Sequence, residues 1–264
     1  LNQTDKLPKV IIPVHLCGQS ADMKEIHRVA NEYGIRIIED ASHGIGATYA
    51  NSPMGNCRYS DIAVFSFHPV KIVTTAEGGV ATTNSANLAQ SMMLARSHGV
   101  TRDPNLMENS SVGGWHYEQI TLGYNYRMTD LQAALGTSQM TRLNEIIERR
   151  VELAAKYDEM LQEIPVKTPI QSKDTISSWH LYVIRVDAAR HRSVFDFLQS
   201  QDIGVNLHYM PVHLQPFYRR KGFKPGQFPN AEDYAKEAIS IPLYFGLTNE
   251  SQKFVVKSLK TALC

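Results

Sequence analysis

The sequence has 264 residues, of which 43% are hydrophobic and 20% are charged, as is typical of a globular protein with a sizeable core. Its 27 basic and 26 acidic side chains give a net charge of +1, which provides no electrostatic reason to expect nucleic acid or an anionic membrane as a partner. No apolar run approaches the roughly 20 residues of a membrane span. Three widely separated cysteines without a CxxC pair indicate free thiols in a reducing compartment, so we expect a cytoplasmic protein.

The start of the chain, LNQTDKLPK, is unlike a signal peptide and lacks an initiating methionine. It leads directly into a predicted strand. We therefore expect the whole protein to carry a further segment before Leu1.

The first part of the chain alternates predicted strands and helices. Near-continuous apolar runs indicate strands that are buried on both faces of a sheet. A strand–helix–strand unit joins parallel strands, so the first two strands should be parallel. The predicted strands are 10–16, 35–40, 61–67 and 78–84, and the predicted helices are 20–33 and 86–98.

The middle of the chain predicts a long loop followed by a long helix. Residues 100–123 are polar and contain adjacent glycines, which predicts a mobile surface loop; loops of this length are usually functional or disordered. From about Thr129 to Ile164 the pattern is helical, with Gly136 as the only break. Pro165 ends the helix, and we expect a domain boundary there.

The predicted organisation is a large α/β domain at 1–164 with a mostly parallel sheet, and a smaller α+β domain at 165–264. In the smaller domain, apolar runs predict strands at 180–186 and 205–210. A helix is predicted around 191–201, and two more helices follow.

Two residues with side chains suited to catalysis lie at or just past the ends of predicted strands of the large domain. Asp40 ends the strand 35–40, and Lys71 lies four residues past the strand 61–67, in SFHPVKIVTTAEGG. Ligands of open α/β sheets bind beyond the carboxyl ends of the strands. Each residue alone fits a structural role, an aspartate in a turn or a solvated lysine. Together they fit a pyridoxal 5′-phosphate (PLP) site, where a lysine amine condenses with the cofactor aldehyde and a carboxylate keeps the pyridine nitrogen protonated.

Two neighbouring side chains complete this hypothesis. The hydroxyl of Ser66 has the chemistry to bind a phosphate oxygen of the cofactor, and as a lone residue it is an ordinary strand serine. His43, three residues after Asp40, is placed to lie against the cofactor ring or reach its phenolic oxygen. A loop histidine bonded to backbone is an equally good interpretation of His43.

Other kinds of site fit poorly. In SHGIGATY, Tyr49 occupies the third glycine position of GxGxxG, so the dinucleotide fingerprint fails. His208 and His213 are close in sequence, but no companion residues have metal-ligand spacing, and we expect no metal site.

The blocks EDASHGIGATY, FSFHPVKIVTTAEGG, RSHG and LGYNYRMTDLQAALG resemble the signature blocks of the DegT/DnrJ/EryC1/StrS sugar aminotransferases. The resemblance runs from Val10 to the C-terminus and implies a fold-type-I PLP enzyme that works as a homodimer with shared active sites. The resemblance implies that Lys71 is the Schiff-base lysine and that Asp40 is the partner of the pyridinium nitrogen. It implies that Ser66 is a phosphate ligand and that His43 replaces a glutamine near the phenolic oxygen. It also implies that Asn125 reaches the cofactor phosphate of the neighbouring subunit and that Arg127, beside it, contacts substrate.

Within the family, His43 together with TTAEGG and GVNLHYMPVH is similar to the branch of pseudaminic acid biosynthesis. That branch implies transfer of an amino group from glutamate to C4 of a UDP-linked 2-acetamido-2,6-dideoxy-4-keto-hexose. His208 and Tyr209 fall where the C-terminal segment of the family approaches the sugar nucleotide. Packing at a strand end is the alternative interpretation of Tyr209.

Three alternatives stay open. A PLP dehydratase of the same fold typically carries histidine in place of the Schiff-base lysine, and Lys71 argues against it. A catalytically silent binding protein of this fold is disfavoured by the presence of Asp40, Ser66 and Lys71 together. An aminotransferase for another nucleotide-linked 3- or 4-keto-sugar is the third, because the sequence does not fix the pose of the substrate.

Overall fold

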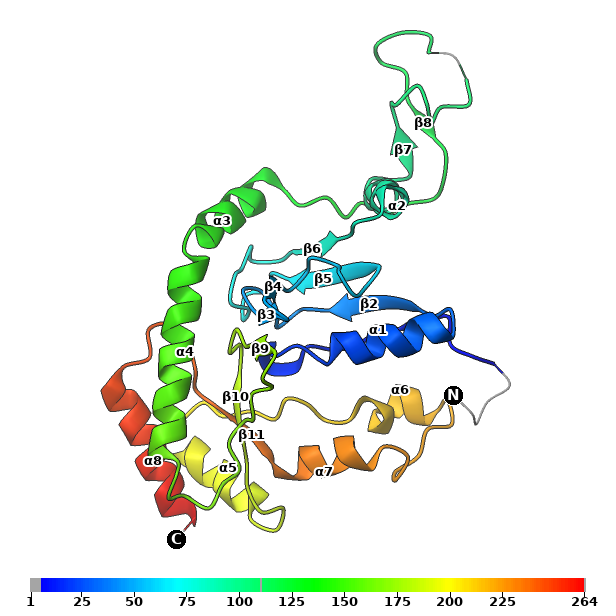
Figure 1. The fold of residues 1–264 in the computed structure, drawn as a ribbon. Helices are drawn as coiled ribbons and strands as arrows, with labels where there is room; N and C mark the ends of the chain where they lie inside the picture. Colours follow the sequence, from blue (N-terminus) through cyan, green and yellow to red (C-terminus); the bar gives the residue numbers. More distant parts are fainter. Residues whose placement is uncertain (1–5, 110, 264) are drawn as a thin grey trace. The chain divides into compact units, whose positions relative to one another are not determined.

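The computed structural model describes residues 6–109 and 111–263, which form two compact units (Figure 1). Each unit is assembled from segments that are distant in sequence. The first unit contains residues 6–16, 20–45 and 51–143, and the second contains 17–19, 46–50 and 144–263.

The first unit is built on a sheet with the strand order β1-β2-β5-β6. Strands β1, β2 and β5 are parallel, and β6 runs antiparallel to β5. The predicted α/β class and the parallel pairing of the first two strands are therefore confirmed. The strands are β1 (Val10–Ile11), β2 (Arg36–Asp40), β5 (Ile62–Ser66) and β6 (Gly79–Thr82).

The first strand is shorter than the apolar run 10–16 predicts. Pro13 has no backbone N–H, so the ladder between β1 and β2 cannot continue through it. Beyond Pro13 the pairing resumes only as an isolated parallel bridge between Val14 and Asp40. The apolar run therefore gives one short strand and one bridge.

The two faces of this sheet differ in exposure. Ile37, Glu39 and Ala63 are buried, whereas Val64, on the opposite face, is 39% exposed. Helix α1 (Met23–Glu32) packs along β2 and buries its own Met23 and Ala30. The α1 side of the sheet is thus closed, and the face that carries Val64 is the open one.

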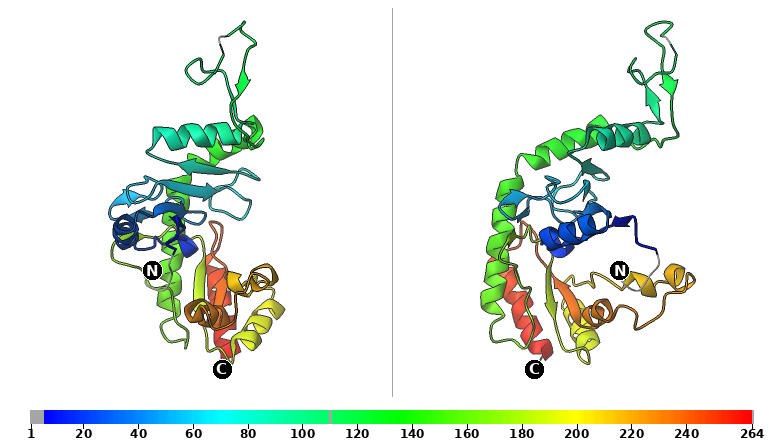
Figure 2. Two further views of the ribbon diagram at one scale, coloured as in Figure 1. Left: turned by 90° about the vertical axis from the view of Figure 1, so that its right-hand side faces the viewer. Right: turned by 45° about the vertical axis from the view of Figure 1, so that its right-hand side comes forward.

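The segment 100–123 is more ordered than the predicted mobile loop. It follows helix α2 (Ala86–Arg96) and forms an antiparallel hairpin of β7 (Val100–Thr101) and β8 (Glu118–Gln119). Figure 2 shows this hairpin projecting beyond α2. The carboxylate of Glu118 accepts hydrogen bonds from the backbone N–H groups of Glu108 and Asn109 and from the Asn109 side chain. These donors lower the pKa of Glu118, the Asn109 side chain most, and hold the long connection against β8.

The predicted long helix is two helices, α3 (Asp130–Met140) and α4 (Leu143–Met160). Thr129 begins α3 with a capping box that includes Gln132. Gly136, predicted as the break, lies inside α3 and is buried. A Cβ there would approach Cγ2 of Thr75 to 2.7 Å, so the glycine permits close packing instead of ending the helix.

Helix α4 belongs to the core of the second unit. Leu153, Tyr157 and Leu161 are fully buried there, together with Tyr182. The compact units therefore divide near Leu143, about one helix before the boundary that Pro165 suggested.

The second unit contains an antiparallel pair of strands, β10 (Tyr182–Arg185) and β11 (Ala238–Ile241). The prediction of a strand at 205–210 is wrong. Only Asn206 in that segment pairs with a strand, through a bridge to Ser240. The residues after it turn away as an irregular segment that leads to Pro211.

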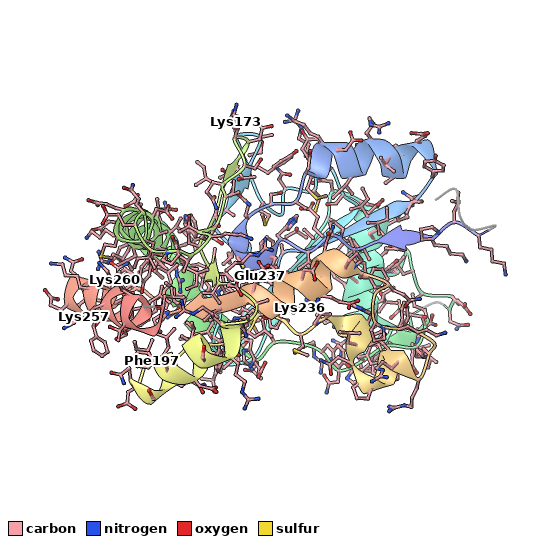
Figure 3. All side chains as sticks on the ribbon, turned by 90° about the horizontal axis from the view of Figure 1, so that it is seen from below. Lys173, Phe197, Lys236, Glu237, Lys257 and Lys260 are labelled. Atoms are coloured by element: carbon pink, nitrogen blue, oxygen red, sulfur yellow. The ribbon has the colours of Figure 1, made fainter. Side chains whose placement is uncertain are left out.

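The remaining elements of the second unit are mainly helices. Among them, α5 (His191–Ser200) confirms the predicted helix around 191–201. Glu237 (Figure 3), at the end of α7 (Pro229–Glu237), accepts hydrogen bonds from Arg185 of β10 and lies 3.5 Å from Lys167. The bonds from Arg185 tie α7 to β10. No helix of the described residues is long and apolar enough to cross a membrane. The remaining elements of the chain are η1 (Leu16–Gly18), β3 (Thr48–Tyr49), β4 (Ser52–Pro53), β9 (Thr175–Ile176), α5 (His191–Ser200), η2 (Val212–Leu214), α6 (Pro216–Arg219), α7 (Pro229–Glu237) and α8 (Asn249–Leu263).

Candidate active site

The open face of the first sheet carries two of the predicted cofactor residues. Asp40 is the last residue of β2 and Ser66 the last residue of β5. Asp40 is in register with Val64, and alternate residues of a strand share a face, so Ser66 lies on the same face as both. The parallel pairing thus brings a carboxylate and a hydroxyl to one edge of the sheet.

Lys71 lies in the loop that joins β5 to β6. The loop begins with a turn in which the Lys71 N–H donates to the His68 carbonyl at 2.9 Å. Further along, the Thr75 N–H donates to the carbonyl of Phe67, and the Phe67 N–H donates to that of Gly78. These bonds close the loop on itself. Ile72 and Val73 are buried directly after the lysine and anchor it.

The Lys71 amine is half-buried, and burial lowers its pKa because a charged amine loses hydration there. The negative charge of Asp40 acts in the opposite direction and raises the pKa. Burial is the larger effect. The structure therefore places the two residues of the predicted pair within electrostatic range of each other.

Asp40 also has a local structural role. Its Oδ1 accepts a hydrogen bond from the backbone N–H of Ser42 at 3.0 Å. This turn leads the chain into His43, which is buried at 6% exposure. The turn role and the cofactor role of Asp40 are compatible, because a carboxylate has two oxygens.

Ser66 is half-buried, and its hydroxyl oxygen accepts a hydrogen bond from the His68 N–H at 3.4 Å. The hydroxyl proton can then point away from the strand toward an anionic ligand. The opposite side of the loop is packed closely by Thr75, whose hydroxyl donates to the Glu77 carbonyl. A Cβ on Gly78 would lie 2.2 Å from that hydroxyl, so the glycine is required for this loop to close.

Asn125 and Arg127 lie in a different part of the first unit. Asn125 is exposed and forms an isolated antiparallel bridge with Ser97, at the end of α2. Arg127 lines a hollow of about 800 Å³ at the base of the β7–β8 hairpin. Arg102 and Tyr117 line the same hollow, with the guanidinium of Arg102 5.9 Å from the Tyr117 ring centroid.

Sequence reasoning missed Arg102 and Tyr117 as possible site residues. They stand 15 residues apart in a segment interpreted as a loop, and only the hairpin pairing brings them together. An arginine and a tyrosine near the ends of a polar segment give no periodic signal.

His208 and Tyr209 belong to the second unit. The Nδ1 atom of His208 lies 2.7 Å from the hydroxyl of Ser240 on β11. The two rings are perpendicular, with centroids 4.8 Å apart, and Tyr209 is 49% exposed. Both side chains therefore have defined positions although their segment is not a strand.

The model of the DegT/DnrJ/EryC1/StrS aminotransferase family matches residues 2–260, almost the whole sequence. The chain belongs to this family. The predicted membership and the expected PLP-dependent sugar aminotransferase class are therefore confirmed at the level of the family.

Individual relatives agree with this assignment. The spore coat polysaccharide biosynthesis protein SpsC of Bacillus subtilis is 36% identical over 96% of this chain and 66% of its own length. The PLP form of the sugar aminotransferase Spr1654 from Streptococcus pneumoniae aligns with a TM-score of 0.87 and 29% identity, over 96% of this chain and 68% of its own. PseC of Helicobacter pylori, an aminotransferase involved in the biosynthesis of pseudaminic acid, aligns at 0.87 and 28%, over 97% and 67%. The chain spans about two thirds of the length of these relatives, and the fold-type-I prediction is confirmed.

We expect Asp40→Asn to lower the pKa of Lys71 further, because the substitution removes the negative charge that favours the charged amine while the burial stays. The measurement is a pH titration of Lys71 in the cofactor-free protein, by NMR of isotopically methylated lysines. Glu77→Gln, on the exposed part of the same loop, is the control and should leave the Lys71 titration unchanged. An unchanged Lys71 pKa in Asp40→Asn would show that the two groups do not interact, and a raised pKa would contradict the expected sign of the Asp40 effect.

Proposed function

We propose that this chain carries a sugar-nucleotide aminotransferase site in which Lys71 bonds covalently to PLP and Asp40 pairs with the pyridine nitrogen. The observation that carries the proposal is the half-buried Lys71 amine, with a lowered pKa, within electrostatic range of Asp40 at the carboxyl edge of the sheet. An ordinary surface lysine is fully hydrated, so burial does not lower its pKa. Perturbed amines next to a specific charge at a strand edge are typical of functional sites.

Each residue has a task that follows from its surroundings. The lowered pKa gives Lys71 a larger neutral fraction, and the neutral amine is the form that attacks an aldehyde and accepts a proton. Asp40 supplies the negative charge that holds a proton on a ring nitrogen. When bound, PLP supplies an electron sink for the carbon from which the proton is removed.

The hydroxyl of Ser66 is assigned to the cofactor phosphate. Its oxygen already accepts from the His68 N–H, so the hydroxyl proton is the part available for an anion. His43 is buried next to the turn after Asp40 and is assigned to the phenolic oxygen of the cofactor ring. Together these assignments place the ring over the open face of the sheet.

For the sugar nucleotide, Arg102 and Arg127 offer two guanidinium groups in one hollow. A guanidinium matches the geometry of a phosphate in two parallel hydrogen bonds, and a diphosphate offers several acceptors. We assign this hollow to the diphosphate of a UDP-linked keto-sugar, and His208 with Tyr209 to the sugar. Glutamate is the amino donor, and the C4 ketone of a 2-acetamido-2,6-dideoxy-hexose is the proposed acceptor, supported by the likeness to PseC.

A homodimer is part of the proposal. Asn125 lies within a segment whose large apolar side chains are exposed, Leu122 to 89% and Leu131 to 86%. Many large apolar side chains left exposed in one segment are typical of a surface that another molecule covers. We define the apolar strip as the exposed residues Val112, Trp115, Tyr117, Leu122, Tyr124, Tyr126 and Leu131 and assign it to the contact with a second copy.

Borohydride reduction of the PLP-loaded protein should attach the pyridoxyl group to Lys71. Peptide mapping by mass spectrometry locates the label. Lys71→Ala should take no label and lose turnover by at least about a thousandfold, equal to roughly 4 kcal/mol of transition-state free energy. Label on another lysine in the wild-type protein would overturn the assignment.

The substrate assignment is tested with a panel of UDP- and dTDP-linked 3-keto and 4-keto sugars. The highest kcat/KM is expected for the UDP-linked 2-acetamido 4-keto sugar, with product carbon identified by NMR. Arg127→Lys should raise KM more than it lowers kcat, because it keeps the charge and loses the paired hydrogen bonds. A preference for a dTDP-linked or 3-keto substrate would select the alternative aminotransferase activity.

Leu131→Glu should shift the protein toward a monomer, because a charge in the apolar strip is costly to bury. Sedimentation velocity at several concentrations measures the shift, and turnover should fall with the dimer fraction because the sites are shared. Ile170→Glu is the matched control, since Ile170 is also 86% exposed and lies in the other unit. A wild-type monomer with full activity would refute the shared site.

A further inference from the structure

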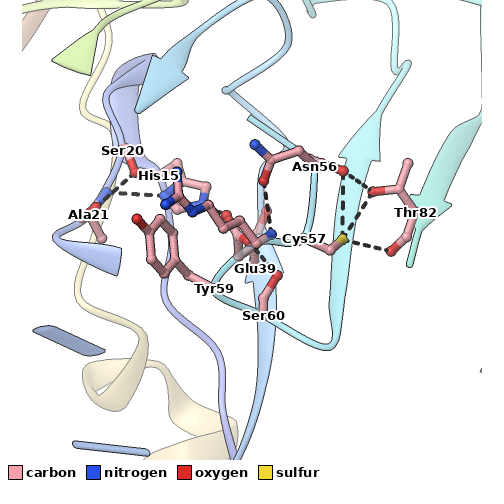
Figure 4. Close-up of polar contacts among 12 residues, drawn as sticks. His15, Ser20, Ala21, Glu39, Asn56, Cys57, Tyr59, Ser60 and Thr82 are labelled. Carbon is pink, nitrogen blue, oxygen red and sulfur yellow. Dashed lines mark hydrogen bonds and ion pairs between the residues drawn. The ribbon is translucent and has the colours of Figure 1, made fainter. Parts of the chain in front are cut away.

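A second carboxylate lies directly beside Asp40 in the sequence and has a different environment. Glu39 precedes Asp40 on β2, and consecutive side chains of a strand point to opposite faces. Glu39 is only 6% exposed, although an isolated buried carboxylate is costly. Each of its oxygens has a donor: His15 at 2.8 Å and the hydroxyl of Ser60 (Figure 4).

The hydrogen bonds define the state of His15, which is fully buried. The backbone N–H of Ala21 donates to its Nδ1 at 3.1 Å, so Nδ1 carries no proton. The ring proton is therefore on Nε2, which donates to Glu39. The Glu39 side chain thus accepts from two neutral donors, the His15 ring and the Ser60 hydroxyl.

The same histidine is bonded to Asp40 through the backbone. The His15 N–H donates to the Asp40 carbonyl at 3.0 Å, and the Asp40 N–H donates to the Pro13 carbonyl at 2.9 Å. Because Pro13 interrupts the β1–β2 ladder, this end of the pairing has little backbone support beyond the bridge at Val14. The side-chain bond between His15 and Glu39 supplies a second attachment at the same place.

Ser60 extends the attachment to the neighbouring strand. It comes just before β5, and the following Asp61 N–H donates to the Ile37 carbonyl at 2.9 Å. The hydroxyl of Ser60 thus joins the start of β5 to the side chain of Glu39. On the closed face of the sheet, the network connects the segment after β1 and the residues just before β5 to the Glu39 side chain on β2.

We infer that the His15–Glu39–Ser60 network positions Asp40: it fixes the carboxyl end of β2 so that the Asp40 carboxylate keeps its orientation toward the cofactor ring and Lys71. The inference rests on the proposed function. None of the three residues is a catalytic residue, because they lie on the face opposite Asp40. Their effect on the reaction passes through the backbone of β2.

Glu39→Gln is the first test, in the PLP-loaded full chain. The amide has nearly the size of the carboxylate but carries no charge, and its NH₂ group can face only the Ser60 hydroxyl, which must then accept the bond that it donated to Glu39. Both hydrogen bonds lose the contribution of the charge and become weaker. We expect kcat to fall about tenfold, or about 1.4 kcal/mol in transition-state free energy, with KM for the sugar nucleotide within about a factor of two. In the absence of substrate, the pH midpoint of the cofactor's visible absorption change should move toward that of Asp40→Asn.

Thr82→Val is the matched control. Thr82 lies on β6 of the same sheet, and its hydroxyl donates to the Gly55 carbonyl at 2.7 Å without any bond to Asp40. Thr82→Val should lower the free energy of unfolding in urea about as much as Glu39→Gln does, but it should leave kcat and the absorption midpoint unchanged. Ser60→Ala removes a single donor from the network and decides the question if Glu39→Gln does not fold.

The outcomes distinguish a failure of the positioning inference from a failure of the proposed cofactor role of Asp40. If Glu39→Gln and Ser60→Ala behave like Thr82→Val while Asp40→Asn loses activity and shifts the midpoint, the network only stabilises the fold and the inference is overturned. If Asp40→Asn itself leaves both readouts unchanged, the proposed role of Asp40 fails first. A shifted midpoint and a lower kcat in Glu39→Gln and Ser60→Ala, with the control unaffected, support the positioning role.

Discussion

The parallel pairing of β2 with β5 is the constraint on which the candidate site depends. It sets Asp40 beside Val64 and so places Asp40 and Ser66 on one face at one edge. The pairing continues past the strand, where the Ala41 N–H donates to the Val64 carbonyl at 2.8 Å. A one-residue slip in this register would turn every side chain of β2 to the other face, exchanging Asp40 for Glu39.

The Lys71 loop shows how the chain resolves two opposed electrostatic demands. Burial disfavours the charged amine, and the Asp40 charge favours it; burial is the larger effect, so the pKa of Lys71 lies below its ordinary value. The loop needs its small residues to hold this position. Gly78 makes room for the Thr75 hydroxyl, and Gly136 of α3 makes room for the Thr75 methyl group, so residues without obvious chemistry fix where the amine lies.

The sequence predicted the central sheet and, except for β1, the approximate ends of its strands, because buried parallel strands read as apolar runs bounded by polar residues. It did not predict the strand at 238–241 or the absence of one at 205–210. Both segments contain apolar residues, but 238–241 pairs along its length with β10, whereas 205–210 pairs only through Asn206. The motif predicted cofactor roles for Lys71 and Asp40, and these roles are part of the proposed function. The His15–Glu39 pair was not, because the two residues are 24 positions apart and neither is unusual by itself.

Glu39 and Asp40 are adjacent in the sequence and both carry a carboxylate, but the two carboxylates have different environments. The Glu39 carboxylate is closed off from solvent and has a donor on each oxygen, so its charge is satisfied by the protein. One oxygen of the Asp40 carboxylate accepts a hydrogen bond from the Ser42 N–H, and the proposed function assigns the other oxygen to the cofactor on the open face. A strand cannot move one of these side chains without moving the other, because they share a backbone. In the proposed positioning role, the satisfied Glu39 carboxylate fixes the strand that carries Asp40, and the stability of the closed face is a condition for the proposed chemistry on the open face.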